Sequence, residues 1–121
     1  MKKIQESKEN YLETILVVEQ RQGQVRSIDV ANELGFSKPS VSRAMGLLKS
    51  LEYIEIDADG FIHLTEEGRE KAKFVLGRHL LIKRYLMEIL KIDEKIAEED
   101  ACHMEHDISE QTFNAMKKVL K

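Results

Sequence analysis

A helix stop and a helix start lie two residues apart early in the chain, which limits the folds that the first half of the sequence can adopt. Gly35 is typical of a helix end, because glycine readily takes the left-handed conformation needed there. Ser37 is the predicted N-cap of the next helix. Pro39 lies in its first turn, where a missing N–H removes no helical hydrogen bond. The sequence therefore predicts two helices, over residues 28–34 and about 38–51, joined by a very short turn.

Apolar and β-prone residues on either side of this pair predict the remaining elements. Tyr11, Ile15 and Val18 recur at helical spacing before Gly23, and Ser27 is the predicted N-cap of the short helix. Two β-prone runs around an Asp-Gly turn predict a hairpin. The expected elements are helices over about residues 3–20, 65–90, 93–107 and 109–121 and strands over residues 53–56 and 61–64.

The predicted order is two helices, a turn, a third helix, a hairpin and three further helices. Proteins that read DNA use a helix pair followed by a hairpin to place the second helix of the pair in the major groove. We therefore expect a mainly α fold, with a winged helix-turn-helix domain over residues 1–64 and a helical domain over residues 65–121. The same fold can serve protein–protein contacts, so the fold alone leaves the function open.

Composition narrows the class of protein. The chain has 121 residues, 42% of them apolar, which suits one domain or one small domain with a helical extension. No stretch approaches the roughly 20 apolar residues of a membrane span, and the first residues lack the apolar core of a signal peptide. We therefore expect a cytoplasmic protein with no membrane partner. The single cysteine, Cys102, excludes an internal disulfide and leaves a buried thiol, a reactive thiol or a metal ligand.

The formal net charge of −3 argues weakly against nucleic-acid binding, but the charges are unevenly placed. Between residues 22 and 50, four cations accompany two acids. Between residues 92 and 110 acids dominate, and Lys95 is the only lysine or arginine. A mildly basic segment followed by an acidic, histidine-containing one is consistent with two functions in one chain.

The start of the second helix of the pair carries the residue types that a DNA-reading helix needs. Small polar side chains can approach base edges, and cations can bind phosphates. Arg43 can form two hydrogen bonds to guanine, and Pro39 can contact a thymine methyl group. The predicted DNA-binding residues are Arg26, Ser37, Lys38, Pro39, Ser40, Ser42 and Arg43. The alternative is an ordinary capped helix with a solvated face.

A second group of residues predicts a metal site. Cys102, Glu105 and His106 are spaced i, i+3 and i+4, which places a thiol, a carboxylate and an imidazole on one helix face. Such a trio can bind a divalent transition metal, with further donors from elsewhere. His79 is either one of those donors or an ordinary core histidine. Cys102 and His106 as a nucleophile and its base form a catalytic alternative that lacks an oxyanion-loop or pocket motif. We therefore predict no catalytic residues.

Several segments resemble the diphtheria-toxin-repressor family of iron- and manganese-dependent repressors, and the resemblance covers nearly the whole chain. The most specific segment is Glu-Asp-Ala-Cys-His-Met-Glu-His at residues 99–106, which looks like the metal helix of that family. Residues 9–12, 37–42 and 77–79 are also similar to family segments. The resemblance implies a homodimeric transcriptional repressor that binds a palindromic operator when loaded with Fe²⁺ or Mn²⁺ and controls metal-uptake genes.

The resemblance also implies a ligand set and a role for the first helix, which metal loading would order. Cys102 matches a cysteine of the iron branch, and Glu13 matches a carboxylate of the manganese branch. Asn10 departs from both branches, which have Met or Asp there, and offers one amide oxygen. The implied metal ligands are Asn10, Glu13, His79, Cys102, Glu105 and His106.

Two alternatives remain open at this point, a metal-independent winged-helix DNA-binding module and a winged-helix protein-interaction module. Salt-dependent binding to an operator would exclude the protein-interaction module. Metal dependence of that binding would exclude the metal-independent DNA-binding module. We also predict a homodimer, formed chiefly by apolar faces of the helices after Asp93. The apolar residues there exceed what a small helical extension can bury: Ile96, Met104, Ile108, Phe113, Met116 and Leu120.

Overall fold

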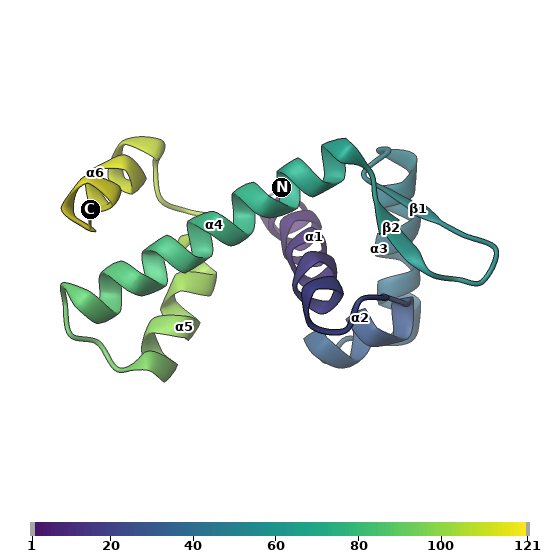
Figure 1. Cartoon of the computed structure of the whole chain (residues 1–121), viewed down its shortest axis with the longest axis horizontal. Helices are drawn as coiled ribbons and strands as arrows, with labels where there is room; N and C mark the ends of the chain where they lie inside the picture. Colours follow the sequence, from purple (N-terminus) through teal and green to yellow (C-terminus); the bar gives the residue numbers. More distant parts are fainter. Residues whose placement is uncertain (1, 121) are drawn as a thin grey trace. The chain divides into compact units, whose positions relative to one another are not determined.

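The described residues, 2–120 for the backbone and 8–120 for the side chains, form six helices and a two-stranded sheet in a computed structural model (Figure 1). The chain divides into two units, residues 1–73 and 74–121, and each is described by itself. Met1 and Lys121, the outer limits of the two predicted domains, lie outside the described residues. The elements are α1 (Lys2–Gln22), α2 (Ser27–Leu34), α3 (Lys38–Ser50), β1 (Ile54–Ile56), β2 (Ile62–Leu64), α4 (Glu66–Glu88), α5 (Glu94–Met104) and α6 (Glu110–Leu120).

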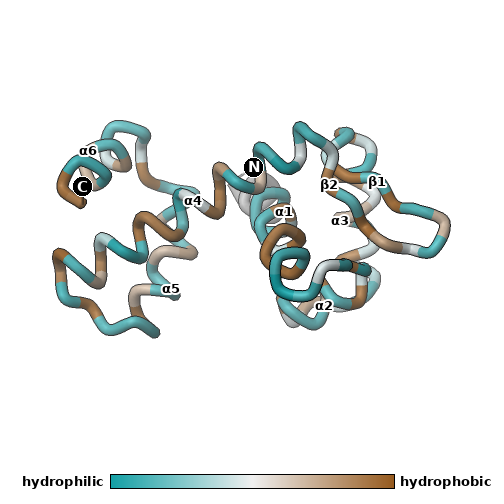
Figure 2. Tube along the Cα trace, viewed as in Figure 1, coloured by the Kyte–Doolittle hydropathy of each residue, from teal (hydrophilic) through white to brown (hydrophobic). Residues whose placement is uncertain are grey.

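The first unit is built around α1, whose apolar face is buried as its helical spacing predicts. Tyr11, Ile15 and Val18 are all buried, and Gly23 ends the helix in the left-handed conformation, with its N–H donating to the Glu19 carbonyl. Apolar and hydrophilic residues alternate along the helix in Figure 2. Helix α1 packs against α2, α3 and β2. The largest fully buried side chains of this unit are Leu12, Ile15, Leu16, Val18, Val25, Val30, Val41, Met45, Leu48 and Ile54.

The helix pair α2–α3 forms where the cap residues predict. Gly35 ends α2 in the left-handed conformation (φ 70°), and the Ser37 hydroxyl accepts a hydrogen bond from the Ser40 N–H at 3.3 Å to start α3. The predicted N-cap Ser27 is wrong by one residue. Arg26 occupies that position, because its backbone N–H donates to the Asp29 carboxylate at 2.9 Å, and this hydrogen bond closes the first turn of α2.

The hairpin β1–β2 is antiparallel, with Ile54 opposite Leu64 and Ile56 opposite Ile62. Its turn is held by Asp57, whose carboxylate accepts the backbone N–H of Asp59 at 2.9 Å and that of Phe61 at 3.0 Å. The short side-chain acceptor fixes the turn locally, as Asp typically does. The wing predicted from the Asp-Gly signal is therefore present.

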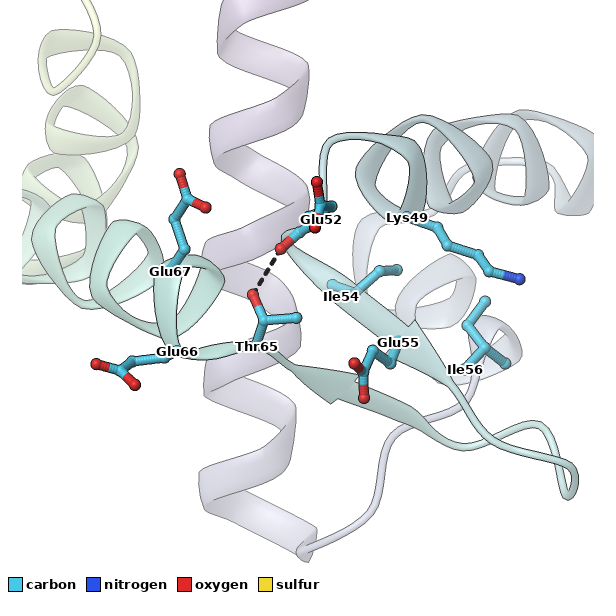
Figure 3. Close-up of a pocket in the computed structure, with 8 residues that line it drawn as sticks. All are labelled: Lys49, Glu52, Ile54, Glu55, Ile56, Thr65, Glu66 and Glu67. Carbon is cyan, nitrogen blue, oxygen red and sulfur yellow. Dashed lines mark hydrogen bonds between the residues drawn. The ribbon is translucent and has the colours of Figure 1, made fainter.

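The joint between the wing and α4 depends on a hydroxyl and a glycine. Thr65 caps α4 by accepting the Gly68 N–H at 3.0 Å, and its hydroxyl donates to the Glu52 carbonyl at 2.7 Å (Figure 3). A Cβ at Gly68 would lie 1.9 Å from the Tyr53 carbonyl oxygen. Only a glycine therefore allows α4 to start this close to the strand.

The second unit contains α4 from Phe74 onward, α5 and α6. Its core is formed by Ile82, Leu86, Ala97, Ala101 and Met116. Helices α5 and α6 start where predicted, beside residues 93 and 109. The Asp93 carboxylate accepts the Ile96 N–H, and the Ser109 hydroxyl accepts the Thr112 N–H. The predicted domain boundary after residue 64 precedes α4, whereas the first turns of α4 belong to the first unit.

Two helices of the second unit end earlier than predicted. Helix α4 ends at Glu88, and Lys91, three residues further on, takes the left-handed conformation (φ 59°). Helix α5 ends at Met104, because the Asp107 N–H donates to the Met104 carbonyl, three residues back, and the chain turns. Glu105 is consequently the C-cap of α5, and His106 lies beyond it.

The expected dimer face is only partly exposed. Met116 and Leu120 are buried within the second unit, and Met104, Ile108 and Phe113 pack against its core. The prediction that these residues are surplus to the unit was wrong, because residues of α4, α5 and α6 form one core that most of them join or pack against. Ile96 is exposed as expected. Among the described residues, no helix has the length and apolar character to cross a membrane.

Candidate metal centre and DNA-reading surface

The exposed face of α3 carries the predicted reading residues. Val41, Met45 and Leu48 turn into the core and leave the opposite face of the helix to the polar side chains. The Ser37 hydroxyl donates to the Ser40 hydroxyl at 3.0 Å, and an Arg43 guanidinium nitrogen lies 3.5 Å from the same Ser40 oxygen. The side chains exposed on this surface are Ser37, Lys38, Pro39, Ser42 and Arg43, with Ser40 half-buried.

A hollow of about 300 Å³ lies beside this surface and extends it to the start of α2. Ser27, Ile28, Lys38 and Ser42 line it. Hydroxyl and ammonium groups are among the donors that proteins use on phosphate oxygens. The start of α2 therefore adds Ser27 to the polar surface. The sequence pattern had predicted this residue as an N-cap.

Arg26 lies at the junction of α2 and the wing. Its guanidinium sits over the Phe61 ring at 4.1 Å, and its backbone bridges to Phe61 beside β2. A cation over an aromatic face is stabilised by the ring quadrupole. The side chain is therefore anchored to the wing while remaining exposed, and its contact with DNA stays a prediction.

The wing itself is acidic. Asp57 pairs with His63 at 2.8 Å, and this hydrogen bond, with those from the turn backbone, lowers the pKa of the Asp57 carboxyl. At the hairpin base, a hollow of about 490 Å³ is lined by Lys49 and by four carboxylates, those of Glu52, Glu55, Glu66 and Glu67 (Figure 3). Phosphate groups are repelled by such a lining, so this hollow does not suit DNA, and the reading surface on α3 stays a prediction.

The candidate metal centre lies in the second unit, where α4 and α5 face each other. His79 on α4 is buried, and its Nδ1 lies 2.7 Å from Oε1 of Glu105, whose side chain is fully buried. Buried charged groups are normally paired and hydrogen-bonded, because the protein interior solvates charge poorly. A buried carboxylate against a buried imidazole is therefore a place where a positive charge is stabilised.

The second oxygen of Glu105 tests whether a metal ion fits. Oε2 is buried and accepts no hydrogen bond from any described residue, and Nε2 of His106 lies 4.0 Å away. His106 is itself almost completely buried, with 5% of its side chain exposed. A carboxylate oxygen without a donor, with two imidazoles near the same carboxylate, matches the donor set of a divalent metal and fits one. Within the second unit, the structure thus brings the predicted ligands His79 and His106 to the same Glu105 carboxylate.

The other predicted ligands have different surroundings. Cys102 is exposed on α5, one turn before Glu105, and its role as a ligand stays a prediction. Asn10 and Glu13 lie on α1 in the first unit, and both are half-buried. His103 is exposed, and its Nδ1 donates a hydrogen bond to the Glu99 carbonyl at 2.9 Å, so it lies outside this cluster.

Glu98 was missed by the sequence analysis. Its Oε2 lies 2.9 Å from Nε2 of His79, and its Oε1 lies 3.0 Å from the ammonium of Lys83. Burial raises the pKa of the Glu98 carboxyl, but the hydrogen bonds from Lys83 and His79 outweigh this, and the pKa is lowered. The signal was present as helical spacing, since Glu98 precedes Glu105 by seven residues and Lys83 follows His79 by four.

A winged helix-turn-helix and a helical unit with a buried histidine–carboxylate cluster define a DNA-binding regulator with a ligand site. Comparison with known proteins identifies the family. Residues 3–60 match the N-terminal DNA binding domain of the iron dependent repressors, and residues 65–121 match their metal binding and dimerisation domain. The chain therefore belongs to the iron-dependent repressor family, whose members are metal-dependent transcriptional repressors rather than enzymes.

Individual relatives agree with this assignment. The chain is 34% identical to an uncharacterised HTH-type transcriptional regulator of Methanocaldococcus jannaschii, over 93% of this chain and 90% of that protein. It is 32% identical to the transcriptional regulator MntR of Escherichia coli, over 90% of this chain and 70% of that protein. It is 29% identical to the diphtheria toxin repressor of Corynebacterium diphtheriae, over 100% of this chain and 54% of that protein.

Solved structures share the fold. The manganese regulator SloR superposes with a TM-score of 0.81 at 26% identity, over 93% of this chain and 53% of that chain. IdeR of T. acidophilum gives a TM-score of 0.84 at 24% identity, again over 93% of this chain and 53% of that chain. This chain thus spans about half the length of these structures. The predicted family, fold class and absence of enzyme activity in the family are confirmed.

Proposed function

We propose that this protein is a transcriptional repressor that binds a palindromic operator as a homodimer when loaded with Fe²⁺ or Mn²⁺, and so controls metal-uptake genes. One observation carries the proposal. Glu105 has a fully buried carboxylate oxygen that accepts no hydrogen bond from any described residue, beside the imidazoles of His79 and His106. Leaving a buried charge unpaired is costly, so this arrangement supports a bound cation.

The donor set supports the choice of metal. Glu105, His79 and His106 would hold the ion with one carboxylate and two imidazoles, while the thiol of Cys102 is exposed. Carboxylate donors suit Mn²⁺ and imidazole donors suit Fe²⁺, so this mixed donor set is compatible with either ion. When bound, the dication supplies the positive charge that the Glu105 carboxylate lacks.

The resemblance to the family adds Asn10 and Glu13 to the proposed ligands. Their place on α1 would connect the metal to the unit that carries the reading helix. A metal ion can shift the DNA-binding equilibrium only by binding more tightly to the DNA-competent arrangement. Donors from both units give it that preference, because an ion held by one unit alone would bind equally well in every arrangement.

The test uses a substitution that keeps the shape of the buried side chain. Glu105→Gln removes the negative charge, and we expect it to weaken Mn²⁺ binding by more than the roughly 10–100-fold that loss of an outer-shell partner costs. Calorimetry measures Mn²⁺ binding, and fluorescence anisotropy measures binding to DNA from upstream of the protein's own gene. We expect the variant to keep its fold, seen by circular dichroism, and to lose metal-dependent DNA binding.

Glu99→Gln is the matched control, because Glu99 is an exposed carboxylate on the same helix. It should bind Mn²⁺ and DNA as the parent does. Unchanged Mn²⁺ affinity and unchanged metal dependence in Glu105→Gln would place the metal elsewhere. DNA binding that is equal with and without metal in the parent would instead identify a metal-independent module.

A further inference from the structure

We propose that Glu98 is a positioning residue for the metal centre: it holds the Nε2–H of His79, so that Nδ1 is the nitrogen presented to the metal. The inference rests on the proposed function, because it assumes that His79 is a ligand. It assigns a role to a carboxylate outside the predicted ligand set. It also states which imidazole nitrogen of His79 binds the metal and which carries the proton.

The two nitrogens of His79 face different carboxylates. Nδ1 lies 2.7 Å from Glu105, and Nε2 lies 2.9 Å from Glu98. A neutral imidazole has one N–H donor and one lone pair, so only one of these nitrogens can ligate, and the other carries the proton. Metal-binding histidines usually donate that remaining N–H to a carboxylate or carbonyl, which fixes the tautomer and the ring orientation.

Burial and unsatisfied atoms indicate the Nδ1 side for the metal. Glu105 is fully buried and has the oxygen that accepts no hydrogen bond from a described residue, and His106 lies on that side. A dication held by Nδ1 and Glu105 would therefore give a partner to the Glu105 oxygen that accepts no hydrogen bond from a described residue.

On the Nε2 side, the negative charge of Glu98 already has a cationic partner in Lys83. Lys83 places its ammonium 3.0 Å from Glu98 and 3.4 Å from Glu94, and half of the Glu98 side chain is exposed to water (51%). A dication beside Glu98 would meet the Lys83 ammonium in the same carboxylate cluster, and like charges at short range repel. Glu98 therefore suits a hydrogen bond to Nε2–H better than a metal bond.

Metal affinity gives the first test, on the full chain with Mn²⁺ alone. We expect Glu98→Ala to weaken Mn²⁺ binding by roughly 10–100-fold, the usual effect of losing an outer-shell partner. Glu98→Gln should recover part of this loss, because its amide oxygen can still accept the Nε2–H. Glu94→Gln is the matched control, since it removes a charge that also faces Lys83 but has no described contact with His79. It should change the affinity less than threefold.

The position of the proton gives the second test, which a purely structural role would not affect. Zn²⁺ is diamagnetic, so ¹⁵N NMR of the Zn²⁺-loaded protein can show which nitrogen of His79 is protonated. We expect the proton on Nε2 and the metal on Nδ1. A metal-bound Nε2, or Glu98→Ala with the parent's Mn²⁺ affinity, would overturn the inference while leaving the proposed function intact. Failure of the parent to bind Mn²⁺ or Zn²⁺ would overturn both.

Discussion

Arg43 projects from the exposed face of α3 one turn after the helix begins. Its nearest described side-chain contact is a long one, 3.5 Å to the Ser40 hydroxyl, so little has to be broken before the guanidinium can bind a base. Ser40 in turn is tied to the Ser37 cap at 3.0 Å. The side chain is thus placed by the helix start and remains available to DNA.

Replacing Arg43 by alanine should weaken operator binding and relax its sequence preference. A two-hydrogen-bond contact to guanine is worth about 1–3 kcal/mol of discrimination. Anisotropy titrations with the operator and with a random duplex measure both effects. Lys49→Ala is the matched control, since it removes one positive charge from the far end of α3. If Arg43→Ala discriminates between the two duplexes as well as the parent does, Arg43 does not read sequence.

The residues that sequence analysis placed correctly are those that act on their own backbone. Gly35 and Ser37 set the end and the start of neighbouring helices within a few residues of themselves. Glu98 could not be assigned in that way, because its role depends on His79, which is 19 residues away along the chain. The position of Arg26 over Phe61 likewise follows from the packing of the wing and not from local pattern.

At the scale of elements, α1 and the first turns of α4 are joined by an ion pair within the first unit. Arg69 binds both oxygens of Glu19, at 2.7 and 3.0 Å, and the two side chains are 37% and 24% exposed. The hydrogen bonds from Arg69 lower the pKa of the Glu19 carboxyl, although its partial burial opposes the shift. The pair therefore connects the start and the end of the first unit.

This pair predicts a pH dependence of stability. A carboxyl with a lowered folded-state pKa contributes its full stabilisation above the unfolded value of about 4.3, and loses it as pH falls toward the folded pKa. Glu19→Gln should therefore lower the free energy of unfolding by about 1 kcal/mol at pH 7 and by less at pH 3.5, after allowing for solvent screening. Urea unfolding at both pH values measures the difference.

Glu33→Gln is the matched control for this pair. Arg21 and Glu33 form one hydrogen bond at 2.8 Å, and their side chains are 53% and 37% exposed. Exposed pairs of this kind contribute little to stability, so the control should have the smaller effect at pH 7. An equal loss in both variants, or a Glu19→Gln loss that does not shrink at low pH, would contradict the prediction.

Helix ends were the least predictable feature of the elements. The sequence around Glu105 continues a helical pattern, yet α5 ends at Met104, and the turn that follows is bound by Arg78, whose guanidinium donates to the Ile108 carbonyl and lies over the Phe113 ring. These contacts come from α4 and α6, so no local pattern could reveal them. The turn nevertheless keeps Glu105 one helical turn after Ala101, whose carbonyl accepts its N–H.

At the scale of the molecule, apolar residues remain exposed on each helix of the second unit. Leu80 on α4, Ile96 on α5 and Val119 on α6 are each about half exposed. Residues 65–121 match a family domain described as metal binding and dimerisation. The residues first expected to form the dimer face largely fill the core of the unit, so these three exposed positions are the better candidates for an interface.

We predict a homodimer at tens of micromolar protein, weakened by Leu80→Glu. A charge at an apolar interface position should cost about 2 kcal/mol, or roughly 30-fold in the dimer dissociation constant. Sedimentation velocity measures the shift, and Ile56→Glu, at an exposed apolar position of the wing, is the control. Each monomer of a two-fold dimer reads half of a palindrome, so Leu80→Glu should also weaken binding to the full operator more than to a half-site. A parent protein that sediments as a monomer with and without Mn²⁺ would contradict the prediction.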